Sequence, residues 1–278
     1  MSDAPATPRP AATVVLARDR PEGGVEIFLV QRHGNMGFMG GMHVFPGGTL
    51  SPDDVGERMR SRIADAAEER VVRPWGGGVE REHALGLAVA AIRETFEEAG
   101  VLLCPVADAT TLAPLRARLL AGDAFATLLE EAGLWLRLDV LTPLSRWITP
   151  KLEPRRYDTL FYLARAPATQ HAAHDEQETI AGAWLSPDAA LAKSRHGEIR
   201  LAPPTARTLE GIRDAPSVDA ALANAARKTP PSIEPIIRVV GDEVWILYPG
   251  DPEHPDREAV FEGPTRVVLR STGVAKSG

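Results

Sequence analysis

The stretch Arg93-Glu94-Thr95-Phe96-Glu97-Glu98-Ala99-Gly100-Val101 decides the fold, because it combines an apolar helical face with three carboxylates. At about 100° per residue, Glu94, Glu97 and Glu98 fall on one side of a helix. The apolar positions fall on the opposite side: Leu85, Val89, Ile92, Phe96 and Ala99. Gly100 follows the last periodic residue, so we predict that it ends the helix in a left-handed conformation. For the apolar residues 101–103 that come next we predict a strand.

The acidic face of this helix is a candidate site for a divalent cation. Glu94 and Glu98 are like charges four residues apart, a pairing that costs a few tenths of a kcal/mol in an isolated helix. A bound cation would reverse that cost, and hard cations such as Mg²⁺ take oxygen ligands. A solvated acidic face is the alternative interpretation, because charged residues on an amphipathic helix commonly face water.

The composition is that of an ordinary soluble enzyme. A chain of 278 residues is long enough for a sizeable core. Its net charge of -7 argues against a general nucleic-acid or anionic-membrane binder. The single cysteine, Cys104, follows an apolar run, so we expect a buried thiol and no intrachain disulfide. We see no secretory leader or long apolar span, and residues 275–278 do not match the Ser-Lys-Leu peroxisomal address, so we expect a cytoplasmic protein.

The remaining sequence indicates alternating strands and helices. We predict strands at residues 13–16, 25–30, 145–148, 159–164 and 180–185, a hairpin formed by residues 235–240 and 244–248, and helices at residues 56–69, 112–120 and 124–132. The alanine-rich stretch after Arg213 is of uncertain order. This pattern predicts the α/β class, although periodicity alone does not give the topology.

Two separated segments together resemble the signature of the Nudix hydrolases, G-x5-E-x7-R-E-U-x-E-E-x-G-U, in which U is apolar. Gly48, in the turn Phe45-Pro46-Gly47-Gly48, matches the first glycine, and Asp54 stands where the first glutamate is expected. Residues 93–101 match the second half, apart from Thr95 at an apolar position. Between the halves lie 38 residues, positions 55–92, where the signature has 7.

An insertion of this kind is similar to that of the coenzyme A diphosphatase branch of the family. The resemblance implies a Nudix fold, which is a mixed β-sheet in an α/β/α sandwich. It also sets the expected organisation of this chain. We predict a flexible N-terminus at residues 1–11, a Nudix domain at 12–213 with insertions at about 55–84 and 105–140, and a C-terminal extension at 214–278 packed on or next to it.

The resemblance also implies roles for individual residues. Glu94, Glu97 and Glu98 match the carboxylates that bind Mg²⁺ or Mn²⁺, and Arg93, at salt-bridge spacing from Glu97, would orient them. Gly47 and Gly48 let the backbone approach the cation site closely. The general base is Glu98 or, in the acidic loop 174–178, Glu178 in preference to Glu176; a solvated acidic turn is the alternative for that loop.

The sequence indicates the type of reaction more firmly than it indicates the substrate. Many coenzyme A diphosphatases carry two arginines before the proline-glycine turn; Arg32 matches the first, whereas Gly37 replaces the second and His33 replaces a small residue. Arg155 and Arg156 are candidates to supply phosphate-binding charge instead.

Three functions follow from these observations. The first is hydrolysis of coenzyme A or acyl-coenzyme A to adenosine 3′,5′-bisphosphate and a 4′-phosphopantetheine product. The second is hydrolysis of another nucleotide diphosphate, such as ADP-ribose or a dinucleotide. The third is a Nudix-like binding module without catalysis, which the intact R-E-x-x-E-E pattern argues against. In each case the partner is a small molecule, neither a nucleic acid nor a membrane, and a homodimer is possible.

Overall fold

A mixed β-sheet forms the centre of the protein. The computed structural model describes residues 5–34, 39–64, 68–104, 109–173 and 179–270. The strand order is β3-β2-β1-β6-β5-β8, and β4 and β7 pair with β1 and β2. The strands of this sheet are β1 (Arg9–Asp19), β2 (Val25–Arg32), β3 (His43–Val44), β4 (Gly47–Thr49), β5 (Thr142–Ile148), β6 (Tyr157–Arg165), β7 (Thr179–Leu185) and β8 (Ser232–Ile233). Most pairs are antiparallel, but β1 pairs with β6 and β5 with β8 in parallel.

Strand β1 divides the core into two clusters because its side chains alternate between the two faces of the sheet. Val14 and Leu16 belong to the cluster that contains the apolar face of helix α4 (Arg81–Ala99). Val15 and Ala17 belong to the other cluster. Both faces of the sheet at β1 are therefore covered by other elements, which keeps the apolar side chains of this central strand out of water.

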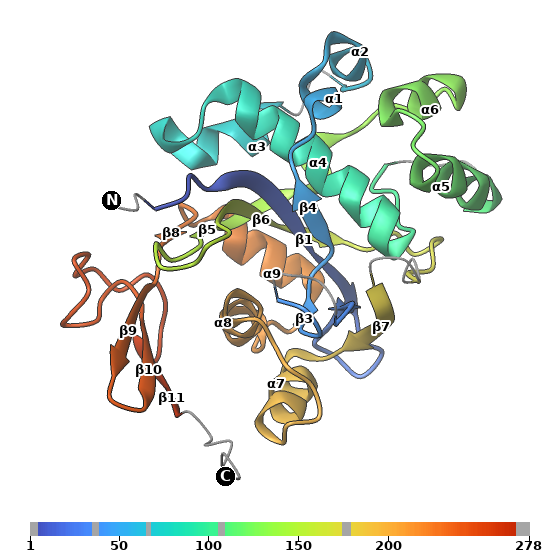
Figure 1. The fold of residues 1–278 in the computed structure, drawn as a ribbon. Coiled ribbons are helices and arrows are strands. Elements are labelled where there is room, and N and C mark those ends of the chain that lie inside the picture. Colours follow the sequence, from blue (N-terminus) through green and yellow to red (C-terminus); the bar gives the residue numbers. More distant parts are fainter. Residues whose placement is uncertain (1–4, 35–38, 65–67, 105–108, 174–178, 271–278) are drawn as a thin grey trace, which may run out of the picture.

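Helices lie on both faces of the sheet (Figure 1). The α4 side also holds α1 (Pro52–Val55), α2 (Glu57–Arg60), α3 (Glu68–Val72), α5 (Leu112–Leu120) and α6 (Phe125–Glu131), and the short 3₁₀ helices η2 (Arg73–Gly78), η3 (Ala109–Thr111) and η4 (Leu138–Val140). Packed against the other face are α7 (Pro187–Arg195), α8 (Pro203–Ile212) and α9 (Val218–Ala226). The predicted α/β/α sandwich is confirmed.

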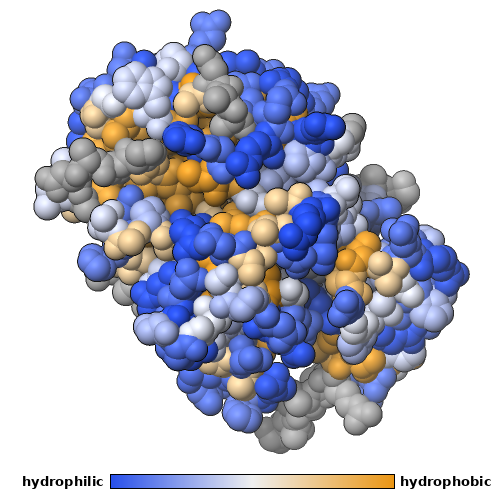
Figure 2. Space-filling view, turned by 180° about the vertical axis from the view of Figure 1, so that it is seen from behind, coloured by the Kyte–Doolittle hydropathy of each residue, from blue (hydrophilic) through white to orange (hydrophobic). Residues whose placement is uncertain are grey.

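A second, smaller sheet follows near the C-terminus. It consists of β9 (Ile236–Val240), β10 (Glu243–Leu247) and β11 (Arg266–Arg270), all antiparallel. The hairpin that the sequence predicts is β9–β10, and β11 is an additional strand. The outer end of this sheet exposes Val239, Val240, Val268 and Leu269. Figure 2, which shows the molecule from behind, has apolar surface on the side where this sheet lies.

The structure corrects several sequence predictions. Residues 101–103 are buried but form no strand. The predicted helix at 56–69 is not one continuous helix, because α2 ends at Arg60 and α3 begins at Glu68, and the stretch after Arg213 contains helix α9. Strand β1 begins at Arg9, where it pairs with Tyr157, so residues 9–11 belong to the sheet and not to a flexible N-terminus.

In the part of the chain that the structure describes, none of the helices combines the length and the apolar composition needed to cross a membrane.

Candidate active site

Helix α4 presents the three glutamates beside strand β4. Its apolar face is buried from Ala84 to Ala99, which fixes the rotation of the helix. Glu98 is buried at 3% exposure, whereas Glu94 and Glu97 are partly exposed. Gly100 ends the helix with φ 67°, in the left-handed region, as the sequence predicts.

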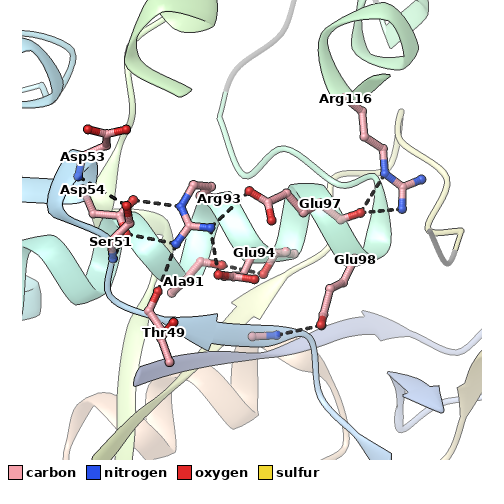
Figure 3. Close-up of polar contacts among 12 residues, drawn as sticks. Thr49, Ser51, Asp53, Asp54, Ala91, Arg93, Glu94, Glu97, Glu98 and Arg116 are labelled. Carbon is pink, nitrogen blue, oxygen red and sulfur yellow. Dashed lines mark hydrogen bonds and ion pairs between the residues drawn. The ribbon is translucent and has the colours of Figure 1, made fainter. Parts of the chain in front are cut away.

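Asp54 lies directly against Arg93, although 38 residues separate them in the chain. The Arg93 guanidinium donates from Nε to Asp54 Oδ1 at 2.9 Å and from Nη2 to Oδ2 at 3.0 Å (Figure 3). Asp54 is 2% exposed, and its carboxylate is also fixed by its own segment, because the Ser51 backbone N–H donates to Oδ2 at 2.8 Å. The insertion therefore leaves the two halves of the signature in contact.

Arg93 also contacts the carboxylates of its own helix. Nη1 donates to Glu94 Oε1 at 2.8 Å and to Glu97 Oε1 at 3.1 Å, and Nη2 donates to the Thr49 carbonyl at 3.1 Å. Burial by itself would lower the pKa of Arg93, but the bonds to Asp54 and the charges of Glu94, Asp54 and Glu97 outweigh it and raise that pKa. The guanidinium is thus a permanent cation among three carboxylates, those of Asp54, Glu94 and Glu97.

Gly47 and Gly48 are required by close approach to the helix and to β1. The Gly47 N–H donates to Glu98 Oε2 at 3.0 Å. A Cβ on Gly47 would collide with the backbone of Ala12 and Thr13, and one on Gly48 would collide with the carboxylate of Glu94. The two glycines thus let β4 lie against the acidic face of α4.

The residues present suit a divalent cation by charge. Asp54, Glu94, Glu97 and Glu98 bring four negative charges to one place, and Arg93 offsets one of them. Three of these carboxylates nevertheless surround the Arg93 guanidinium and not a free space (Figure 3), and Glu98 accepts from the Gly47 N–H. Within the described ranges, accordingly, no three His, Cys, Asp or Glu side chains are grouped so as to hold a metal ion.

The predicted substrate-binding arginines lie in different surroundings. Arg32 is the last residue of β2, and its Nε is buried and has no hydrogen-bond partner among the residues that the structure describes. Arg155 is exposed. The Arg156 guanidinium is buried and donates to the Thr149 and Ala6 carbonyls and to Glu234, so these contacts support a structural role, and its predicted phosphate contact stays a prediction. Glu178, the alternative base, lies outside the described residues.

One contact at this site has no signal in the sequence. Arg116, from helix α5 in the predicted insertion 105–140, reaches the C-terminal end of α4 and donates to the Glu97 carbonyl (Figure 3). The spacing of Arg116 from Glu97 matches no helical period, and the sequence of α5 indicates only an ordinary amphipathic helix. Only the packing of α5 against α4 shows that these residues meet.

Comparison with known proteins identifies the family. The family model described as the NUDT19 Nudix domain matches residues 76–212. The acyl-coenzyme A diphosphatase NUDT19 of Gallus gallus is 30% identical over a match that covers 94% of this chain and 85% of its own length. The chain belongs to the Nudix hydrolase family. The resemblance to the coenzyme A diphosphatase branch, predicted from the split signature, is thereby confirmed.

Further comparisons place this Nudix hydrolase among proteins of the same fold. The acyl-coenzyme A diphosphatase NUDT19 of Homo sapiens is 25% identical, with 97% of this chain and 83% of its own length covered. A crystal structure of a Nudix hydrolase from Alicyclobacillus acidocaldarius matches with a TM-score of 0.66 and 28% identity, covering 78% of this chain and 96% of that chain. The protein is thus a hydrolase of diphosphate anhydride bonds.

Proposed function

We propose that this Nudix hydrolase cleaves the diphosphate linkage of coenzyme A or an acyl-coenzyme A, with Mg²⁺ or Mn²⁺ as cofactor. The products would be adenosine 3′,5′-bisphosphate and 4′-phosphopantetheine or its acyl derivative. The observation that carries the proposal is the Arg93–Asp54 contact, which restores one acidic site from two separated segments. The substrate class is supported by the matched relatives in Gallus gallus and Homo sapiens, which are named acyl-coenzyme A diphosphatases.

Glu94, Glu97 and Glu98 would hold the cation. A divalent cation bound there would neutralise phosphate charge and lower the pKa of the attacking water. Glu94 and Glu97 are partly exposed and share one guanidinium nitrogen, Nη1 of Arg93, so a rotation of each side chain is enough to turn an oxygen away from it. Arg93 would remain anchored through Asp54, and would thereby keep the backbone of α4 in place against β4.

In the reaction, the water oxygen forms a bond to phosphorus as the bond from phosphorus to the bridging oxygen breaks. A carboxylate must take the proton of the water. Glu98 is our choice among the described residues, since its carboxylate is buried and fixed by the Gly47 N–H. Glu178 stays the alternative. The buried Arg32 Nε supports a phosphate contact, because a buried donor normally has an acceptor.

A substrate panel tests the proposal. Coenzyme A, acyl-coenzyme A, 3′-dephospho-coenzyme A, ADP-ribose and a dinucleotide are compared with Mg²⁺ and Mn²⁺, and kcat/KM is measured for each by product chromatography. We expect the coenzyme A compounds to be cleaved fastest and removal of the 3′-phosphate to lower the rate. Faster cleavage of ADP-ribose would overturn the substrate assignment, and absence of metal-dependent cleavage of every compound would favour a binding module.

The variant Glu98→Gln tests the base. Glutamine keeps the size and the acceptor for the Gly47 N–H but cannot take a proton, so we expect kcat to fall by about 10²- to 10⁴-fold with an unchanged fold. The matched control is Glu80→Gln at the other end of α4, where the side chain is 85% exposed. Near-normal turnover of Glu98→Gln with Mg²⁺ would shift the assignment to Glu178.

The remaining predictions about partners and location are tested by separate measurements. Light scattering of the purified protein distinguishes a monomer from the homodimer that the sequence permits. Imaging of a tagged chain tests the cytoplasmic expectation.

A further inference from the structure

The last turn of α4 carries Glu97 and Glu98, and a helix end leaves its final carbonyls without partners inside the helix. Here each of three carbonyls has an identified donor. The Phe96 carbonyl accepts from Gly100 N–H at 3.0 Å, and the Ala99 carbonyl accepts from Ala173 N–H at 2.9 Å. The Glu97 carbonyl accepts from Arg116, which donates from Nε at 2.9 Å and from Nη2 at 2.7 Å.

Arg116 joins this helix end to a third segment. Its Nη2 also donates to the Ala173 carbonyl at 3.0 Å. Three residues earlier, the Gln170 side chain accepts from Leu102 N–H at 2.8 Å and donates to the Leu102 carbonyl at 2.9 Å. One guanidinium therefore bridges helix α4 and the chain that leaves β6, and both are fixed relative to α5.

Gly100 makes room for this guanidinium. A Cβ on Gly100 would lie 2.9 Å from Nη1 of Arg116 and 3.3 Å from its Cζ. Glycine thus suits position 100 for two reasons: the backbone there is left-handed, and the planar guanidinium of Arg116 leaves no room for a side chain. Arginine suits the contact, because its planar fork can serve two carbonyls at once, whereas a lysine ammonium cannot reproduce that geometry.

We propose that Arg116 is a positioning residue of the active site, which holds the last turn of α4 so that Glu97 and Glu98 keep their orientation beside β4. This inference rests on the proposed function, because it concerns the same carboxylates. Glu98 is fixed at its side-chain end by the Gly47 N–H, and Arg116 fixes the backbone from which the side chain starts. Release of the helix end changes the direction of both glutamates without removing either carboxylate.

The surroundings of Arg116 permit a chemical rescue. A hollow of about 390 Å³ lies beside it, lined by Gly100, Leu112, Ala117, Gln170 and His171 among others. In the variant Arg116→Ala, a free guanidinium ion is small enough to enter from this hollow and occupy the place of the lost group. The matched control is Arg118→Ala on the same helix, whose ion pairs with Asp123 and Glu131 lie at the surface.

The test compares the two variants and the wild type by Mn²⁺ calorimetry, by kcat and KM for coenzyme A, and by thermal unfolding. For Arg116→Ala we expect Mn²⁺ affinity and kcat to fall by about 10- to 100-fold. Guanidinium, far below concentrations that unfold proteins, should restore a measurable part of both values. Arg118→Ala should match the wild type with and without guanidinium.

Two results would overturn the role of Arg116: wild-type Mn²⁺ affinity in Arg116→Ala, or a loss that guanidinium does not reduce while the protein remains folded. If Arg116→Ala does not fold, Arg116→Lys keeps the cation and should show a smaller loss in the same direction; wild-type values in that variant contradict the inference. A failure of the proposed function is recognised separately, because the wild type would then show neither Mn²⁺ binding nor an effect of Glu98→Gln.

Discussion

Asp54 shows how one short side chain joins the two halves of the active site. It is almost fully buried, and both of its oxygens accept from Arg93. The Ser51 N–H and the first turn of α1 hold the carboxylate in that position. The aspartate takes the place that the family signature gives to glutamate, and the contact is made although the side chain is one methylene shorter.

We expect Asp54→Asn to weaken both the fold and the catalysis. The amide offers one acceptor where the carboxylate offers two, so about 1–3 kcal/mol of unfolding free energy should be lost. Metal affinity and kcat should fall by about 10- to 100-fold, since Arg93 loses its anchor. Chemical denaturation and steady-state kinetics measure the two effects. The control is Asp53→Asn, an exposed neighbour in the same helix; equal effects in both variants would contradict the role of Asp54.

The residues of the site were predictable to the extent that they follow one helix. Glu94, Glu97 and Glu98 share a face by periodicity, and the structure places them as predicted. Asp54 was matched to the first glutamate of the signature, but its contact with Arg93 could not be predicted, because the pairing across 38 residues depends on the path of the insertion. The surroundings of Arg156 could not be predicted either, because a basic residue before a strand does not reveal whether its guanidinium will be enclosed by carbonyls and Glu234.

At the scale of the elements, the packing of α1 on α4 sets where Asp54 lies. Gly86, in the buried part of α4, faces Val55 and Leu50. A Cβ at this position would collide with Val55 Cγ1 and would lie 2.9 Å from Leu50 Cδ1. Val55 follows Asp54 directly, so the distance between the two helices also determines the contact with Arg93.

We therefore expect Gly86→Ala to be harmful although alanine favours a helix. The gain in helix propensity is about 0.5–1 kcal/mol, and overpacking costs about 1–3 kcal/mol. The melting temperature should fall, and kcat should fall with it as α1 moves away. The control is Gly211→Ala in α8, where the added methyl meets no neighbour. A more stable Gly86→Ala would show that α1 adapts without cost.

Elements with a strong local pattern were predicted well, whereas some short segments whose state depends on distant pairing were not. Helix α4 follows from its apolar periodicity and Gly100. Residues 101–103 are as apolar as a typical strand, but in the structure they are buried in the core without forming a strand. Strand β11 was missed because it belongs to the sheet only through its pairing with β10.

At the scale of the whole molecule, the C-terminal region shares its core with the central sheet. Tyr248 is 1% exposed and packs against Trp147 of β5 and Phe261, with ring centroids 6.1 and 5.3 Å apart. Val218 and Ile233 belong to the same cluster as Val15. These contacts support our proposal that residues 214–278 form an extension packed on the Nudix domain.

Tyr248→Ala should consequently destabilise the entire protein. Loss of a buried aromatic side chain costs about 3–5 kcal/mol, a large part of the stability of an ordinary domain. Denaturant unfolding followed by tryptophan fluorescence and by circular dichroism should show one transition at a lower midpoint. The control is Val239→Ala, where the side chain is 71% exposed. Separate transitions for the two probes would mean that the extension unfolds by itself.

Asp54 and Arg93 are held together by hydrogen bonds, not by a short connection of the chain. A chain divided in the segment that separates α2 from α4 would still carry each partner of this contact on its own fragment. The two fragments, produced separately, are expected to recombine and regain activity, because Val71 and Trp75 of that segment would still be available to pack in the core.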